Sequence, residues 1–247
     1  MTTTHPSPPR SVFATMGTIV SLRVEGGLPP DLESAVRTTF ERLDHRFSTY
    51  RPDSEASAVA AGRITPDAAS AEFRDAYVKA LHWQRQTDGA FSPIRPDGPI
   101  DLSGIVKALA IQQAVDVLHS SQIANWCLNA GGDVVVDGCQ SSGEPWVIGL
   151  VDPDDRQSLV SQYTSPTAGA AVATSGTSER GDHVWRTDQT FRQVSVVAGD
   201  IITADVLATA ILAGGPTTLQ KAQADHDIEV FAVDQAGRPW ASRAFRA

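Results

Sequence analysis

The chain has 247 residues, of which 41% are hydrophobic and 20% are charged, with a formal net charge of −9. This composition is typical of a globular protein, and the length allows one large domain or two small ones. The negative charge and the lack of a Lys/Arg cluster argue against nucleic acid as the main partner. No apolar run approaches the length expected of a membrane span.

The N-terminal residues are polar and rich in Thr and Pro, without the basic and apolar regions of a secretory signal. We therefore expect residues 1–12 to form a disordered tail, residues 13–247 to form a single domain, and the protein to be cytoplasmic. The two cysteines, Cys127 and Cys139, flank a Gly-Gly turn. Without an export signal, free buried thiols are expected there.

The first half of the chain predicts one strand followed by three helices. Alternating apolar residues predict a strand over 19–24, and apolar residues at helical spacing predict helices over about 31–47 and 71–86. A polar loop that contains Pro52 is expected over 47–54. The third helix is expected to begin at Asp101, as its N-cap, and to end at about Leu118.

The second half is mostly strands. Strands are predicted over 124–128, 133–136, 146–150, 170–173 and 193–197, and residues 152–169 are expected to form a long surface loop. A helix over about 203–212, ending at Gly214-Gly215, and a short one over 216–224 precede strands over 228–233 and 239–243. Because helices and strands come in blocks, the sequence predicts an α+β fold with largely antiparallel sheets.

The start of the third helix has features of an anion-binding site. Ser103 and Gly104 leave the backbone accessible, the helix N-terminus offers unpaired N–H groups, and Lys107 adds a cation one turn further on. Phosphate is the usual ligand of such a site. The alternative is an ordinary capped helix with a solvated lysine.

The late helix carries potential metal ligands. Asp205 and Thr209 are four residues apart, so they share a helix face and can reach one cation. Their hard oxygen atoms suit Mg²⁺ or Ca²⁺. The alternative is that Asp205 merely stabilises the helix N-terminus and that Thr209 is buried.

Two further motifs are weak when taken singly. Gly131-Gly132 lies between two apolar strands and suits a tight hairpin turn or a ligand cradle. His183 is the histidine best placed to act as a general base, because the other five lie in the tail, in ordinary helical positions or on the expected surface. A lone histidine is nevertheless more often structural.

Taken in order, the motifs resemble those of the ApbE family, the FAD:protein FMN transferases. The matching segments cover nearly the whole chain from about residue 13. They are Met16-Gly17-Thr18, residues 47–54, Gly89-Ala90-Phe91-Ser92-Pro93, residues 101–107, residues 129–133, Ala173-Thr174-Ser175-Gly176 and residues 204–209.

The resemblance implies a two-lobed α+β fold with packed helices, in which FAD lies in a cleft between the lobes near a Mg²⁺ ion. By position, the implied FAD contacts are Met16, Tyr50, Ala90, Phe91, Ser92, Asp101, Lys107 and, on the flavin side, Trp185. The implied Mg²⁺ ligands are the carbonyl groups of Gly104 and Ala208 and the side chains of Asp205 and Thr209.

The implied reaction is Mg²⁺-dependent transfer of FMN from FAD to a threonine hydroxyl of a target protein, with release of AMP. Such a reaction needs charge neutralisation at phosphorus and a base for the hydroxyl proton. By the resemblance, His183 takes the proton, Asp205 and Thr209 fix the metal, and Lys107 compensates phosphate charge.

Two other functions remain open from the sequence. The same site would serve a Mg²⁺-dependent FAD pyrophosphatase that yields FMN and AMP, or a FAD-binding protein without turnover. The chain also departs from the family pattern at three places. Arg186-Thr187-Asp188 stands where the family continues with Asp-Pro-x-Thr-Gly, Ser92 where Asp is common, and Ala108 where Gly is common.

Overall fold

The computed structural model describes residues 10–176 and 187–245. Its strands are β1 (Arg10–Thr15), β2 (Thr18–Val24), β3 (Trp126–Ala130), β4 (Asp133–Asp137), β5 (Val147–Val151), β6 (Leu159–Thr164), β7 (Ala170–Gly176), β8 (Phe191–Ala198), β9 (Glu229–Asp234) and β10 (Pro239–Ala241). Its α-helices are α1 (Pro30–Phe47), α2 (Glu55–Ala60), α3 (Ala71–Gln86), α4 (Ser103–Ser120) and α5 (Ile201–Asp225). Short 3₁₀ turns cover Pro66–Ala68 and Arg243–Phe245.

Eight of these strands form one sheet in the order β1-β2-β3-β4-β7-β8-β9-β10. Every neighbouring pair in this sheet is antiparallel. Strands β5 and β6 form a separate antiparallel hairpin. The prediction of an α+β fold with antiparallel sheets and packed helices is confirmed. The two lobes and the cleft between them stay a prediction.

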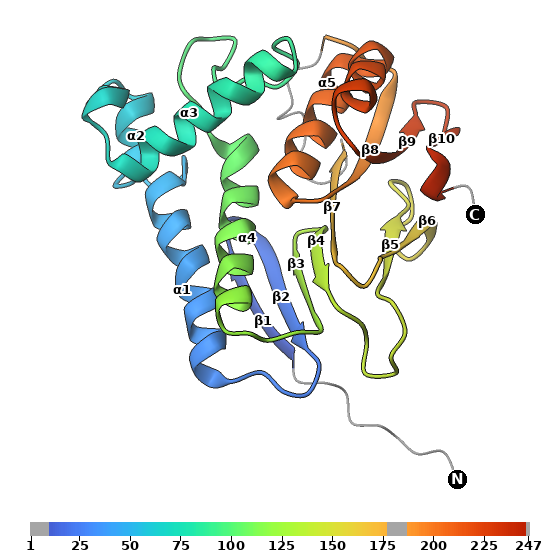
Figure 1. Cartoon of the computed structure of the whole chain (residues 1–247). Coiled ribbons are helices and arrows are strands. Elements are labelled where there is room, and N and C mark those ends of the chain that lie inside the picture. The colour runs from blue at the N-terminus through green and yellow to red at the C-terminus, as the bar shows by residue number, and fades with distance from the viewer. Residues whose placement is uncertain (1–9, 177–186, 246–247) are drawn as a thin grey trace.

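The middle of the sheet is covered on both faces. Helices α4 and α5 pack on one face, α1 lies against α4, and the β5–β6 hairpin lies on the side away from the helices (Figure 1). Along β7 the side chains alternate between these two cores, because Ala171 and Ala173 face the helices while Ala170 and Val172 face the hairpin. Burial on both faces explains why β7 is apolar at successive positions.

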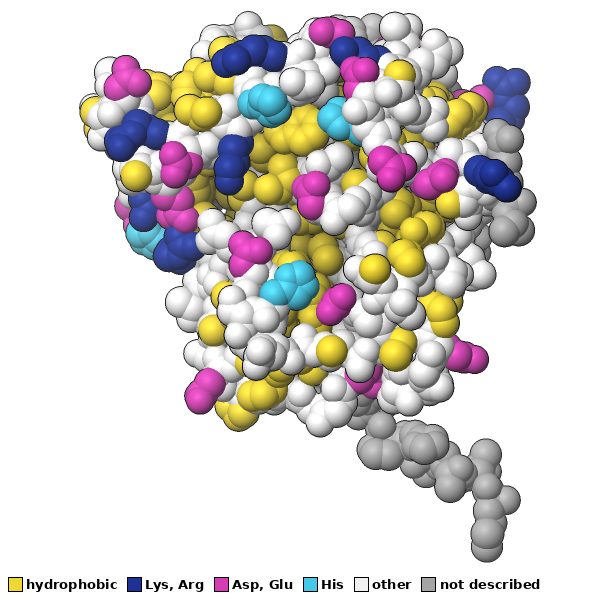
Figure 2. All heavy atoms as spheres, in the orientation of Figure 1, with side chains coloured by type: hydrophobic (Ala, Val, Ile, Leu, Met, Phe, Trp, Pro, Cys, Tyr) yellow, Lys and Arg dark blue, Asp and Glu magenta, His cyan; other side chains and the backbone are white. Residues whose placement is uncertain are grey.

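The helical periodicity seen in the sequence corresponds to real buried faces. In α1 the buried side chains are Leu32, Val36, Phe40, Leu43 and Phe47, which recur at spacings of three and four residues. On the face drawn in Figure 2, Lys and Arg side chains are interspersed with Asp and Glu, and apolar side chains show between them. Helix α1 therefore packs through one apolar stripe, as an amphipathic helix does, whereas α4 and α5 are buried at successive positions.

Two predictions at the ends of strands were wrong. Residues 10–12, expected in the disordered tail, belong to β1, which pairs with β2 through a turn at Met16-Gly17. The alternation of buried and exposed side chains in β1 is short, with Phe13 buried and Val12 exposed. It also follows a Pro-rich segment, so the sequence did not indicate a strand there. The surface loop expected over 152–169 contains β6, whose polar side chains are half-buried or exposed and gave no apolar pattern.

Helix boundaries also differ in detail. The helices predicted over 203–212 and 216–224 form one long element, α5, which is kinked at Gly215 (φ 68°) before Pro216. Its N-cap is Asp200, whose carboxylate accepts the Thr203 N–H at 2.9 Å, so the helix begins earlier than predicted. Helix α2 was missed because it is short, although Ser54 caps it through the Ser57 N–H at 2.9 Å.

One described helix, α5, is long and apolar enough by length and composition to cross a membrane, with a mean hydropathy of 1.3 in its most apolar window. Within the fold, 61% of that window is buried. Packing against β7, β8 and α4 accounts for its apolar character. Helix α5 is therefore the core helix of this fold.

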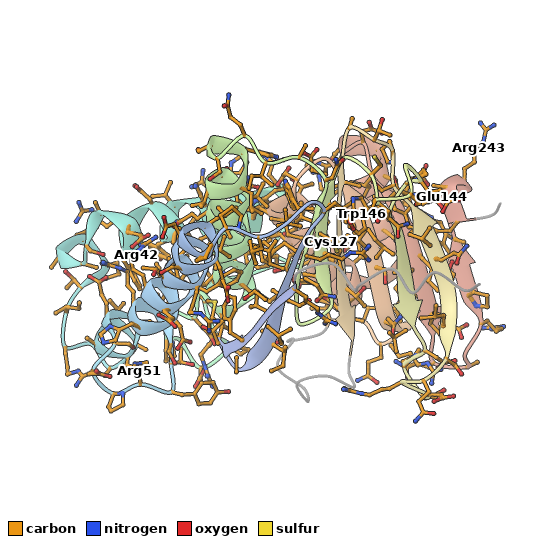
Figure 3. The ribbon with its side chains drawn as sticks, turned by 90° about the horizontal axis from the view of Figure 1, so that it is seen from below. Arg42, Arg51, Cys127, Glu144, Trp146 and Arg243 are labelled. Atoms are coloured by element: carbon orange, nitrogen blue, oxygen red, sulfur yellow. The ribbon has the colours of Figure 1, made fainter. Side chains whose placement is uncertain are left out.

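Both cysteines are free, as predicted, and both are half-buried. Cys127 lies in β3 opposite Val136 of β4 and contacts the core under the hairpin. It is labelled together with Trp146 near the middle of the molecule in Figure 3. Burial raises the pKa of the Cys127 thiol to about 11, although Arg23 and Arg10 act in the opposite direction.

Candidate active site

A cavity of about 660 Å³ opens at one end of the large sheet. The strand order places the β1–β2 turn, the β3–β4 turn and the C-terminal end of β7 at this end. All three contribute to the wall, through residues 17–19, Gly131 and residues 174–176. Residues 89–101 before α4, the start of α4 and one face of α5 complete it. The volume lies in the range typical of small-molecule sites.

The start of α4 lies directly in the cavity wall. Asp101 accepts the N–H of Ser103 at 2.9 Å, so its carboxylate satisfies one backbone donor of the first turn. The N-cap position itself is Leu102, one residue later than predicted. Gly104 comes so close to the Phe91 ring that a Cβ there would lie 3.1 Å from it. A larger side chain at this position would have to displace the Phe91 ring.

Lys107 forms an ion cluster with two carboxylates. Its ammonium group contacts Asp133 Oδ2 and lies 3.8 Å from Asp205 Oδ1. Asp133 is fully buried, and its other carboxylate oxygen accepts the Thr174 N–H at 3.2 Å. The cluster therefore ties α4, β4, β7 and α5 together behind the cavity wall.

Hydroxyl groups continue this network. Ser175 Oγ and Thr209 Oγ1 share a hydrogen bond of 3.0 Å, and both residues line the cavity. Behind them, Thr174 Oγ1 and the fully buried Ser195 Oγ are 2.8 Å apart. If Thr209 donates to Ser175, its lone pairs remain available to a cation.

The donor set fits a hard divalent cation. Asp205 is 5% exposed, lines the cavity, and shares it with the Thr209 hydroxyl one helical turn further on. In residues 10–176 and 187–245, no group of three or more His, Cys, Asp or Glu side chains could hold a metal. One carboxylate with a hydroxyl and carbonyl groups suits Mg²⁺ and does not suit zinc.

The structure brings together most of the residues predicted for the site. Those that line the cavity are Ala90, Phe91, Ser92, Asp101, Gly104, Lys107, Asp205 and Thr209. The Ser92 hydroxyl accepts a hydrogen bond from Gln84 of α3 and also bonds to the backbone of Ile94.

Other predicted residues do not line it. Met16 is half-buried at the β1–β2 turn, where its neighbour Gly17 reaches the cavity. Tyr50 is 88% exposed in the loop after α1, and Ala208 is fully buried within α5. His183 and Trp185, the predicted base and flavin contact, lie outside the described residues.

Sequence reasoning missed two charged residues of the site. Asp133 is the last residue of the Asn129–Asp133 motif, and a carboxylate that opens an apolar strand needs a buried partner, which was the available signal. Arg156 lines the cavity from the β5–β6 loop. No local pattern marks it, because its place depends on how the hairpin folds back on the sheet.

The fold and the cavity define a small-molecule site whose donors suit a phosphate and a divalent cation. The family model of the ApbE family matches residues 16–98 and 94–232 of the chain. The chain therefore belongs to the ApbE family.

Curated relatives support this assignment at low identity. The "FAD:protein FMN transferase" of Salmonella typhimurium is 24% identical over 319 residues, covering 99% of this chain and 91% of that protein. The proteins of the same name from Klebsiella pneumoniae and Vibrio cholerae are 25% and 29% identical, over 74% and 61% of this chain. Those two matches span only 57% and 50% of the relatives' own length.

Solved structures show the same fold. The ApbE protein of Thermotoga maritima superposes with a TM-score of 0.77 at 20% identity, covering 95% of this chain and 97% of that one. The flavinyl transferase ApbE of Pseudomonas stutzeri, in its apo form, gives a TM-score of 0.78 at 22% identity, covering 96% and 94%.

Proposed function

We propose that this protein transfers FMN from FAD to a threonine hydroxyl of a target protein and releases AMP. The observation that carries the proposal is the convergence of two helices on one cavity. The start of α4 supplies Gly104 and Lys107, and α5 supplies Asp205 and Thr209. Phosphoryl transfer needs this combination of anion binding and charge neutralisation more than it needs covalent chemistry.

In the proposed reaction, the threonine oxygen attacks the phosphorus atom of the FMN half of FAD. A new oxygen–phosphorus bond forms, and the bond from that phosphorus to the bridging oxygen breaks. The bridging oxygen leaves with AMP, and the hydroxyl proton passes to a base. His183 remains the predicted base, on the resemblance alone.

The metal site would be formed by the Asp205 carboxylate, the Thr209 hydroxyl and the carbonyl groups of Gly104 and Ala208. Bound Mg²⁺ supplies charge neutralisation at the pyrophosphate oxygens. Asp205 is held by its place on the buried helix α5, and Thr209 by its hydrogen bond to Ser175. These contacts fix both ligands before any cation enters, which lowers the cost of ordering them.

Lys107 has a different part in this proposal. It is bound to Asp133 and close to Asp205, so its charge is largely compensated within the protein. It therefore holds the acidic residues in place, and its ammonium group can donate hydrogen bonds to a ligand. It adds little net positive charge to the cavity. Residues 89–92 and Asp101 would line the FAD-binding side of the same cavity.

Release of AMP, measured with and without a threonine-bearing acceptor peptide, tests the proposal. With FAD and Mg²⁺, AMP that appears only with the acceptor supports FMN transfer. AMP that appears without acceptor supports the pyrophosphatase, and bound FAD without AMP leaves a FAD-binding protein. A peptide in which alanine replaces the threonine is the matched control for the acceptor.

Two protein variants separate the metal site from general effects on α5. Asp205→Asn keeps the shape of the side chain but removes the charge in the cavity, so AMP release should fall by at least about a hundredfold. Asp225→Asn makes the same change at the exposed end of the same helix and should leave AMP release unchanged. Equal activity of the two variants would refute the assigned metal ligand.

The acceptor protein and a cytoplasmic location stay predictions within this proposal. The acceptor would have to present its threonine at the mouth of the cavity. The FAD and acceptor-protein partners follow from the name that the curated relatives carry.

A further inference from the structure

We propose that Arg156 binds the pyrophosphate of FAD and supplies the positive charge that Lys107 does not. This inference rests on the proposed function, because it names a residue that holds its substrate. It starts from the charges in the cavity wall. Within the described residues, the charged side chains that line the cavity are Asp101, Lys107, Arg156 and Asp205.

The balance of these charges disfavours an anion. Lys107 is shared between Asp205 and the buried Asp133. Asp101 adds a further carboxylate at the start of α4, where it accepts the Ser103 N–H. Three carboxylates against one lysine leave two negative charges, which a divalent metal would balance, so the pyrophosphate dianion needs a further cation. Arg156 is the remaining cation among the described lining residues.

The loop that carries Arg156 keeps its own carboxylates occupied. Asp152 accepts the Asp154 N–H at 2.8 Å. Asp155 accepts the Gln157 N–H at 3.0 Å and the Ser158 hydroxyl at 2.7 Å. In the described part of the chain, no hydrogen bond or ion pair engages the Arg156 guanidinium. The loop thus presents Arg156 to the cavity and keeps its neighbouring carboxylates in bonds to the loop itself instead of to Arg156.

A second contact fixes this loop to the large sheet. Arg192 donates two hydrogen bonds to the Asp154 carboxylate, at 2.9 and 2.6 Å. The β8 register shifts between Phe191 and Gln193, so Arg192 lies at a bulge that turns its side chain out of the ladder. Gln193, which is buried, donates to the Val151 carbonyl at 3.0 Å at the start of the same loop.

Arginine suits this role for a physical reason. Its planar guanidinium group forms paired hydrogen bonds to phosphate oxygens and keeps its charge at every relevant pH. Since the loop is already held by Asp154 and Gln193, little conformational entropy is lost when Arg156 binds a ligand. Asp154 and Arg192 are positioning residues in this arrangement, because they act on the ligand only through the loop.

The test is equilibrium binding of FAD, ADP and riboflavin to the full chain in the presence of Mg²⁺. Arg156→Gln should weaken FAD and ADP binding by roughly tenfold or more, the loss expected for a charged hydrogen bond. Riboflavin, which has no phosphate, should bind equally to wild type and variant. Arg156→Lys should restore part of the lost affinity. Asp154→Asn should weaken ADP binding by a smaller factor.

The matched control is Arg243→Gln, which removes the same charge from an exposed residue that does not line the cavity and lies at the outer edge of the molecule in Figure 3. Equal ADP affinity of Arg156→Gln and Arg243→Gln would overturn the inference. A loss of affinity that is as large for riboflavin as for ADP would also overturn it.

The same data keep the two proposals apart. Binding of ADP that depends on Arg156, in a protein that releases no AMP from FAD, would support this inference and refute the proposed FMN transfer. If Arg156→Gln changes neither AMP release nor ADP affinity, the result would refute this inference and leave the proposed FMN transfer standing. A wild-type protein that binds neither ADP nor FAD would refute both.

Discussion

At the scale of single residues, the central feature is a lysine held between two carboxylates. Asp133 is fully buried, and Lys107 is 15% exposed, so their ion pair lies at the boundary between the core and the cavity. Removing one partner of such a pair leaves a charge with too little compensation. The pair is thus both a structural tie and part of the site.

Replacing Asp133 by Asn should lower the free energy of unfolding by roughly 2–3 kcal/mol, somewhat less than is usual for a broken buried pair, since Lys107 still has Asp205 nearby. Asp137→Asn, in the same strand but half-buried, should change it by less than about 0.5 kcal/mol. Urea denaturation measures both values. Equal losses of unfolding free energy in the two variants would show that the ion pair between Asp133 and Lys107 does not stabilise the fold.

The free thiol of Cys127 gives a pH-dependent prediction. Its pKa is raised to about 11 by burial, so the folded protein should hold far less thiolate at pH 8 than the unfolded chain. In a Cys139→Ser variant, alkylation of Cys127 should be about a hundredfold slower in the native protein than in urea. The native rate should keep rising as the pH approaches 11.

The sign for stability follows from the same shift. The folded state keeps the Cys127 proton between about pH 9 and about pH 11, where the unfolded chain loses it, so stability should fall across this window. Native and denatured rates that coincide at pH 8 would contradict the raised pKa.

At the scale of elements, the cavity depends on two turns that touch. Gly131, in the β3–β4 turn, has φ +63°, and its N–H donates to the Ile19 carbonyl of β2 at 3.0 Å. A Cβ at Gly131 would lie 2.3 Å from Thr18 Oγ1. This contact locks the β1–β2 turn against the β3–β4 turn, and both turns line the site.

Gly131→Ala should therefore cost about 1–3 kcal/mol more than Gly143→Ala, because overpacking adds to the backbone strain that both changes share. Gly143 also has a positive φ (+83°), but a Cβ there would meet nothing within 4 Å. Thermal unfolding of both variants measures the difference. A Thr18→Ala change in the Gly131→Ala background should recover part of the loss. Equal costs would rule out the contact between the turns.

Elements with a regular apolar period could be predicted from the sequence, and the site could be predicted only in part. The spacing of Leu32, Val36 and Phe40 is enough to place α1, whereas β6 has no such pattern because Leu159 is exposed and most of its other residues are polar. Gly104 and Asp205 were found because helix ends and helix faces are local features. Asp133 and Arg156 act through contacts between distant strands and loops, which no local spacing encodes.

At the scale of the whole molecule, the cavity lies where the layers of the fold meet. Helices α4 and α5, the end of the large sheet and the β5–β6 loop all contribute to its wall. A ligand that contacts all of them should stabilise the entire fold, because it binds the folded state alone.

FAD with Mg²⁺ should therefore raise the melting temperature by roughly 5–10 °C at a ligand concentration near 100 times its Kd. In Asp205→Asn, FAD should still raise it, but added Mg²⁺ should give no further increase. Differential scanning calorimetry with FAD, Mg²⁺ and both together measures this. If Mg²⁺ still raises the melting temperature of Asp205→Asn further, the metal does not bind at Asp205.

The most direct measurement of the central claim is the intact mass of an acceptor peptide after incubation with this protein, FAD and Mg²⁺. The proposed function predicts a mass increase of one FMN, located on the threonine, with one AMP released for each modified peptide. It also predicts that Asp205→Asn abolishes the increase while Asp225→Asn preserves it. An unmodified peptide in the presence of bound FAD, across a panel of threonine-bearing sequences, would contradict the account.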